Sequence, residues 1–161
     1  EGVRTISSDL HPHHIDRLGF CAAVETMACK LFRASTIAID CRCSPIDGLI
    51  PKENKIHLFR IIQESLTNII RHSAASSAQL EIAQTDHTIT ITIDDNGKGF
   101  DLHEFDASAN SSGLSNEISR GFGINSMTER ARIAGAHLEI ITGQGSGTKI
   151  LVTVPLTENV S

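Results

Sequence analysis

The most informative segment of this chain reads Thr88-Ile89-Thr90-Ile91-Thr92-Ile93-Asp94-Asp95-Asn96-Gly97-Lys98-Gly99-Phe100. Threonine and isoleucine alternate over its first six residues, which predicts a β-strand with one buried face. Asp94 and Asp95 follow at the end of this strand, and an ionised carboxylate there can accept a hydrogen bond from a ligand's exocyclic amine. Gly97 and Gly99 would let the backbone come close to such a ligand. A simple turn explains Asn96-Gly97 equally well.

The flanking segments predict the remaining elements of one domain. Residues 78–84 form a second strand, joined to the alternating one around Asp86-His87 as a hairpin. The other predicted strands cover 36–43, 137–142 and 148–154, and the predicted helices cover 17–34, 51–73 and 121–134. These elements predict an α+β fold, a two-layer sandwich with about three helices on one face of a mixed five-stranded sheet.

The composition excludes several classes of protein. With 161 residues, 40% of them hydrophobic and 20% charged, the chain is expected to fold as a single globular domain. Its net charge of −5 argues against a general binder of nucleic acids or anionic membranes. No apolar run approaches the ~20 residues that a membrane span needs, and the first residues do not read as a signal peptide.

Four cysteines fall in the first third of the chain, at positions 21, 29, 41 and 43. Their spacing is not that of a zinc ribbon, so we expect reduced side chains that act as small core hydrophobes. Cys41 and Cys43 would share one face of a strand, which leaves a metal or disulfide role as the alternative.

The helix predicted over 51–73 carries two stripes. The apolar stripe consists of Phe59, Ile62, Leu66 and Ile69, and the polar stripe of Arg60, Glu64, Asn68 and His72. A glutamate and an asparagine one turn apart can position a metal-bound oxygen together with a water molecule. Mg²⁺ suits this arrangement because it takes few protein ligands and fills its other positions with phosphate and water. The alternative is a solvated helix face.

The C-terminal third contains two further glycine-rich segments. Gly121 and Gly123 are predicted at the start of a helix, where backbone N–H groups can face a phosphate, or where they only form an N-cap. The polar residues 101–120 before them predict a lid. Gly145-Ser146-Gly147-Thr148 predicts a tight hairpin, and the Thr148 hydroxyl could also contact a ligand or a water beside it.

The order of these motifs resembles the Bergerat-fold ATPases, the superfamily of gyrase, the heat-shock chaperone, histidine kinases and the mismatch-repair ATPase. Within it, the chain resembles the sensor histidine kinases of the nitrate-sensor-like subfamily. The segments that carry the resemblance are Gln63 to Ser73 (the N box), Asp94 to Phe100 and Gly121 to Ala131 (the two glycine boxes), and Leu10 to Phe20 (the segment that follows the dimerisation helices).

The resemblance implies a role for each matching residue. It implies binding of ATP with Mg²⁺, with Asp95 accepting the adenine amine, Asn68 holding the metal and Glu64 polarising the attacking group. The implied catalytic residues are Glu64 and Asn68, and the implied nucleotide-binding residues are Asn68, Arg71, His72, Asp95, Gly97, Gly99, Gly121, Gly123 and Thr148.

The same resemblance implies an organisation and partners. Residues 1–16 are expected to be a linker, residues 17–161 the catalytic domain, and residues 101–120 its lid. The γ-phosphoryl would pass to a histidine of the dimerisation domain and then to an aspartate of a response regulator, in the cytoplasmic part of a membrane-anchored, homodimeric sensor. In this family the acceptor histidine precedes an acidic residue. Among the eight histidines only His103 does, and it falls in the predicted lid, so we expect the acceptor helix upstream of residue 1.

Three alternatives remain open on the same fold. A freestanding serine kinase of the anti-sigma type would need no linker segment, and an ATP-driven switch would need a phosphate-binding lysine from a further domain. A binding module with a decayed site would not be expected to keep Glu64, Asn68 and Asp95. The fate of the γ-phosphoryl separates these alternatives: a histidine kinase transfers it to histidine, an anti-sigma kinase transfers it to serine, and a switch releases it as free phosphate.

Overall fold

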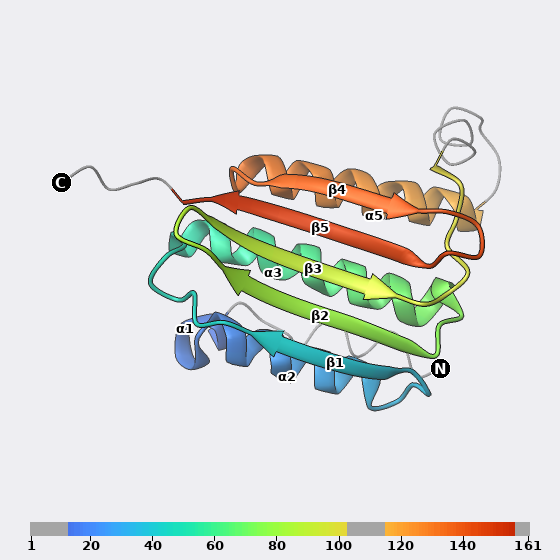
Figure 1. Cartoon of the computed structure of the whole chain (residues 1–161), viewed down its shortest axis with the longest axis horizontal. Helices are drawn as coiled ribbons and strands as arrows, with labels where there is room; N and C mark the ends of the chain where they lie inside the picture. Colours follow the sequence, from blue (N-terminus) through green and yellow to red (C-terminus); the bar gives the residue numbers. More distant parts are fainter. Residues whose placement is uncertain (1–12, 103–114, 157–161) are drawn as a thin grey trace.

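The computed structural model describes residues 13–102 and 115–156, and within them it contains one five-stranded sheet (Figure 1). The strands are β1 (Ala38–Cys43), β2 (Ser77–Gln84), β3 (Thr88–Asp95), β4 (His137–Thr142) and β5 (Thr148–Pro155). Their order across the sheet is β1-β2-β3-β5-β4. β1 runs parallel to β2 and every other neighbouring pair is antiparallel, which confirms the predicted mixed sheet.

The helices cover one face of this sheet and leave the other face uncovered (Figure 1). They are α1 (His13–Leu18), α2 (Phe20–Phe32), α3 (Lys52–Asn68), a π-helical turn η1 (Ile69–Ser73) and α5 (Ser115–Ile133). The α+β two-layer architecture is therefore confirmed. None of the helices described is both long enough and apolar enough to cross a membrane.

The alternating segment from Thr88 to Ile93 lies in the central strand β3. Its isoleucines Ile89, Ile91 and Ile93 are almost completely buried, whereas the threonines between them are only half-buried. Leu66 and Ile62 from α3 belong to the same core, as the apolar stripe of that helix predicted. The two layers are held together mainly by burial of these aliphatic side chains, each of which contributes roughly 1.5–3 kcal/mol.

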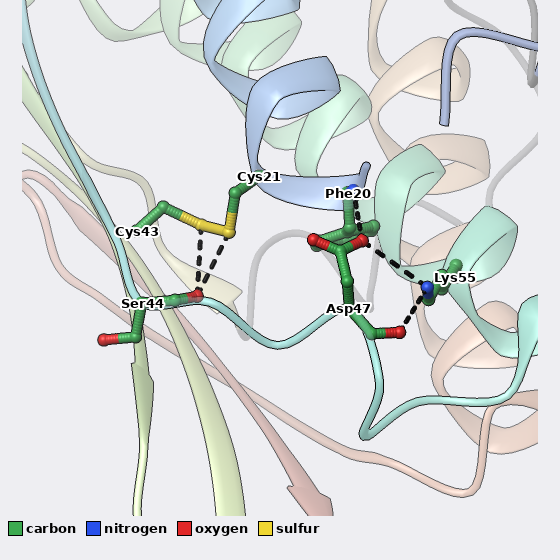
Figure 2. Close-up of a disulfide and its surroundings, with 6 residues drawn as sticks. All are labelled: Phe20, Cys21, Cys43, Ser44, Asp47 and Lys55. Atoms are coloured by element: carbon green, nitrogen blue, oxygen red, sulfur yellow. Dashed lines mark hydrogen bonds and ion pairs between the residues drawn. A yellow bond between two sulfur atoms is a disulfide. The ribbon is translucent and has the colours of Figure 1, made fainter. Parts of the chain in front are cut away.

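The helix predicted over 17–34 is divided at Gly19, so its predicted start was wrong. Gly19 has φ +85°, a backbone conformation that would strain any other residue. The carboxylate oxygen Oδ1 of Asp47 accepts the backbone N–H of Phe20 at 2.6 Å, and the Lys55 ammonium donates to the Asp47 carbonyl oxygen at 2.6 Å (Figure 2). The start of α2 is thus fixed by a side chain 27 residues further along the chain.

The helix predicted over 121–134 begins six residues earlier than expected, at Ser115. Once Met127 and Ala131 are buried, each residue added at the helix start forms one more hydrogen bond, so the helix extends through the polar segment. Gly121 and Gly123 consequently lie inside α5 and not at its first turn. Most of the predicted lid, residues 103–114, lies outside the described residues.

The cysteine prediction was wrong for two of the four side chains. Cys21 in the first turn of α2 and Cys43 at the end of β1 form a disulfide, with their Cα atoms 5.9 Å apart (Figure 2). The tertiary packing of α2 over the end of β1 brings these positions together, which the spacing along the chain could not reveal. Cys29 and Cys41 are free, and burial raises the pKa of the Cys41 thiol to about 11.

Loss of this disulfide is expected to lower the free energy of unfolding. A cross-link between residues 22 positions apart restricts the unfolded chain, and such restriction is worth about 2–4 kcal/mol. Denaturant unfolding of Cys43→Ser should show that loss, whereas Cys29→Ser, at an exposed free cysteine, should leave the midpoint unchanged. Equal midpoints for the two variants would contradict the role of the bond.

Candidate functional site

A pocket opens between the C-terminal part of α3, the end of the sheet and α5. Five of the residues predicted from the sequence line it: Asn68, His72, Asp95, Gly99 and Thr148. They come from α3, η1, β3, the loop after β3 and β5, so the fold gathers residues that are as much as 80 positions apart in the sequence.

The greater part of the pocket wall is apolar. It is formed by Ile69, Ile93, Phe100, Ile124, Met127, Ile140 and Ile150. Several of these side chains were expected only as core residues, or not noted at all, because nothing in the periodicity separates an isoleucine under a pocket from one deeper in the core. An apolar slot with few polar groups is typical of a site for a flat, largely apolar ring.

Among the described residues that line this slot, Asp95 is the one with a carboxylate, and only 6% of its surface is exposed. Its Oδ1 atom accepts the backbone N–H of Gly97 at 2.8 Å, which fixes the orientation of the carboxylate. Burial raises the pKa of Asp95, and the neighbouring charge of Asp94 adds to this effect, while the N–H groups of Gly97 and Thr148 partly oppose it. A buried carboxylate with a raised pKa inside a pocket is typical of a functional residue.

The glycines around Asp95 are required by close backbone packing. A Cβ atom on Gly97 would overlap the Ser73 carbonyl oxygen, and one on Gly99 would overlap the Gly143 carbonyl oxygen. The turn between β4 and β5 contributes Gly147, whose Cβ would overlap the carbonyl oxygen of Asp95 itself. The glycines therefore set the shape of the wall that carries the carboxylate, as predicted for Gly97 and Gly99. For Gly147 the sequence predicted only a tight hairpin.

Gly147→Ala is expected to be considerably more destabilising than Gly145→Ala. Gly147 has φ +71° and Gly145 has φ +78°, so each substitution places alanine in the left-handed region at a similar cost of roughly 1 kcal/mol. Only Gly147 packs against Asp95, whereas a Cβ on Gly145 would meet nothing within 4 Å. Thermal unfolding of the two variants measures the difference, and equal losses would contradict the packing argument.

Glu64 and Asn68 lie one turn apart on α3 and face α5 at Gly123. A Cβ atom on Gly123 would lie 2.5 Å from Oε1 of Glu64 and 3.7 Å from Nδ2 of Asn68. Within the part of the chain that the structure describes, neither side chain forms a hydrogen bond or an ion pair with a protein group. Asn68 lines the pocket, and Glu64 lies beside it without lining it. Because Gly123 has no side chain, α5 leaves room for Glu64 and Asn68, whose side chains remain available to a ligand.

The remaining predicted residues lie on η1 and α5. His72 lines the pocket from η1, but the adjacent Arg71 is exposed and does not line it. Gly121 and Gly123 lie inside α5, where their N–H groups are used by helix hydrogen bonds, so their predicted place at a helix start was wrong. Their part in nucleotide binding stays a prediction.

The π-helical turn η1 explains how α3 delivers side chains to the pocket. Its extra residue per turn occurs where Ile69, His72 and Ser73 line the pocket, and it ends at Ala74 in the left-handed conformation, φ 52°. The Ser73 carbonyl then accepts the N–H of Lys98 at 2.8 Å, which ties this turn to the glycine loop. Such π-turns are frequent at functional sites.

Comparisons with known proteins agree with this fold. A model of the family described as histidine kinase-, DNA gyrase B-, and HSP90-like ATPase matches residues 53–158. Sensor histidine kinase LiaS of Bacillus subtilis is 38% identical over 110 residues, 68% of this chain, and sensor protein VraS of Staphylococcus aureus is 35% identical over 112 residues, 70% of the chain. The histidine kinase domain of the blue-light activated histidine kinase of Erythrobacter litoralis has the same fold, with a TM-score of 0.68 at 21% identity over 85% of this chain and 65% of that one.

The chain therefore belongs to the histidine kinase-, DNA gyrase B-, and HSP90-like ATPase family. Within that family, the two curated relatives named above are sensor kinases, which agrees with the resemblance predicted from the sequence. The chain spans only 27% and 29% of the length of these two relatives.

Proposed function

We propose that this chain is the ATP-binding catalytic domain of a sensor histidine kinase, which binds Mg-ATP and transfers the γ-phosphoryl to a histidine outside this chain. The observation that carries the proposal is a buried, pre-oriented Asp95 at one end of an apolar slot, with the uncommitted side chains of Glu64 and Asn68 near the other. One end suits a base with an exocyclic amine, and the other suits phosphate and a cation.

The adenine end follows from the chemistry of its wall. Ile93, Ile140 and Ile150 offer an apolar surface to the faces of a purine. Asp95 offers carboxylate oxygens in the plane of the base, where the 6-amino group can donate. The hydrogen bond from Gly97 to Oδ1 holds the carboxylate in place before any ligand arrives, so little conformational entropy is lost on binding.

The phosphate end depends on side chains more than on backbone N–H groups. The amide oxygen of Asn68 is a suitable Mg²⁺ ligand, and a Mg²⁺ ion held there together with phosphate and water would neutralise phosphate charge. His72 lines the same wall, and Arg71 on η1 is exposed next to it and long enough to reach a polyphosphate tail. Gly121 and Gly123 would serve by allowing a close approach of α5.

Glu64 is the residue that we assign to the transfer step. Its carboxylate lies one turn from Asn68 and has no partner in the described part of the chain, so it can accept a hydrogen bond from the incoming histidine imidazole. Orienting that ring, and stabilising the positive charge that develops on it as the N–P bond forms, would help the γ-phosphoryl leave ADP. The phosphorylated histidine would then supply a response-regulator aspartate.

The partners implied are those of two-component signalling: the dimerisation and phosphoacceptor domain of the same protein, as a homodimer, and a response regulator. We propose residues 1–16 as the linker to that domain, residues 17–161 as the catalytic domain and residues 101–120 as its lid. A cytoplasmic position beneath a membrane-anchored sensor fits this assignment.

Calorimetric titration with a non-hydrolysable ATP analogue, with and without Mg²⁺, tests the proposal. Saturable binding that Mg²⁺ strengthens is expected, and no binding at millimolar ligand would overturn it. Addition of ATP with the separately expressed phosphoacceptor domain should then give an acid-labile phosphohistidine. An acid-stable phosphoserine on a partner would indicate the anti-sigma type of kinase, and release of free phosphate alone would indicate an ATP-driven switch.

A further inference from the structure

The hydroxyl group of Thr142, at the end of β4, joins three segments around the pocket. It donates to the carbonyl oxygen of Gly147 at 3.0 Å and accepts the backbone N–H of Phe100 at 3.1 Å. The Oγ1 atoms of Thr142 and Thr148 lie 3.1 Å apart. Thr142 does not itself line the pocket, but Phe100 and Thr148 do.

The positions of the hydroxyl protons follow from a simple count. A threonine hydroxyl carries one proton and two lone pairs. The Gly147 carbonyl cannot donate, so the Thr142 proton is used for that bond. The bond between the two hydroxyl groups must then use the proton of Thr148, because otherwise two oxygen lone pairs would face each other at 3.1 Å. Thr148 therefore has no proton left for a ligand.

We propose that Thr142 is a specificity-determining positioning residue, because it holds the Thr148 hydroxyl as a hydrogen-bond acceptor toward the pocket and so favours a 6-amino purine over a 6-oxo purine. This inference rests on the proposed nucleotide-binding function. Asp95 and Thr148 are directly paired across β3 and β5, so both belong to the same edge of the pocket. With the Thr148 proton committed, both side chains present only acceptors to a base.

An acceptor-only edge discriminates by repulsion as well as by attraction. The 6-amino group of adenine donates to Asp95, and a bridging water can donate to both Thr148 and a ring nitrogen. The 6-carbonyl oxygen of hypoxanthine would instead meet oxygen lone pairs, a mismatch that costs more than the loss of a hydrogen bond. A Thr148 hydroxyl that could rotate freely would donate to this carbonyl and relieve part of the mismatch.

The experiment compares ADP with inosine diphosphate on the wild-type chain and on Thr142→Val. Valine keeps the shape of threonine and removes the oxygen, so the Thr148 proton is released. In Thr142→Val, we expect the dissociation constant of inosine diphosphate divided by that of ADP to fall about tenfold from its wild-type value. Thr142→Ser should keep the wild-type ratio, because serine restores the hydroxyl. Thr142→Ala releases the same proton with a smaller side chain and should repeat the result of valine.

The double variant Thr142→Val/Thr148→Val separates this role from a structural one. It has no hydroxyl group at either position, so Asp95 alone should then set the ratio of the two dissociation constants. If Thr142→Val and Thr142→Ala weaken both nucleotides by the same factor, Thr142 only supports the pocket wall and the proposal is overturned. If the wild-type chain binds neither nucleotide, it is the proposed function that fails.

Discussion

Asp95→Asn is expected to weaken ATP binding by roughly 2–4 kcal/mol, about 30- to 1,000-fold, while leaving the chain folded. Asparagine can still accept the Gly97 N–H through its own Oδ1. Its amide NH₂ then occupies the position of the second carboxylate oxygen, so a donor faces the 6-amino donor of adenine. Calorimetric titration with ADP measures the loss.

Asp94→Asn is the matched control for this prediction. Asp94 is the preceding residue on β3, and its side chain points to the uncovered face of the sheet, where it pairs with Lys149 at 3.2 Å with 41% of the side chain exposed. Loss of the Asp94 charge should leave the ADP affinity within about a factor of two of the wild-type value. Equal affinity of Asp95→Asn and the wild-type chain would remove Asp95 as the base-recognising residue.

The raised pKa of Asp95 adds a dependence on pH. Adenine binding requires the ionised carboxylate, so ADP affinity should decrease as the pH falls through this raised pKa. The native state binds the proton more readily than the unfolded state, for which the ordinary value is 3.8. The contribution of Asp95 to the free energy of unfolding therefore increases as the pH falls between these two values, and decreases as it rises. Asp95→Asn should abolish both trends, which parallel titrations and denaturant unfolding would reveal.

Asn68→Ala is expected to abolish the strengthening of nucleotide binding by Mg²⁺ and to reduce phosphoryl transfer at least about 100-fold. The adenine end of the pocket is unchanged, so metal-free ADP should bind as it does to the wild-type chain. The separation of these two effects is the physical signature of a metal ligand. It is measured by titrations with and without Mg²⁺ and by transfer to the phosphoacceptor domain.

Thr67→Ala is the control on the same helix. The Thr67 hydroxyl donates to the Gln63 carbonyl within α3 and does not line the pocket, so its loss should not change the effect of Mg²⁺. Transfer at the wild-type rate by Asn68→Ala would assign the metal to another residue.

Local patterns were sufficient for most of the architecture. The alternation of isoleucine and threonine over 88–93 defined the central strand because a side-chain period of two has only one structural solution with one buried face. The polar stripe of α3 placed Glu64 and Asn68 on one face because the helical period is equally fixed. These periods act between near neighbours in the chain, so they can be found without knowledge of the fold.

Long-range contacts decided what those patterns could not. Asp47 fixes the start of α2, α2 packing pairs Cys21 with Cys43, and α5 extends to Ser115 once its later residues are buried. Thr142 and Gly147 act on Asp95 and Thr148 only because β4 and β5 fold back next to β3. The sequence by itself determined the fold class and the family, and it predicted Glu64, Asn68 and Asp95 as candidate site residues. Only the tertiary structure decided which hydrogen-bonding groups remain available around them, because the use of each donor and acceptor depends on neighbours that are distant in the chain.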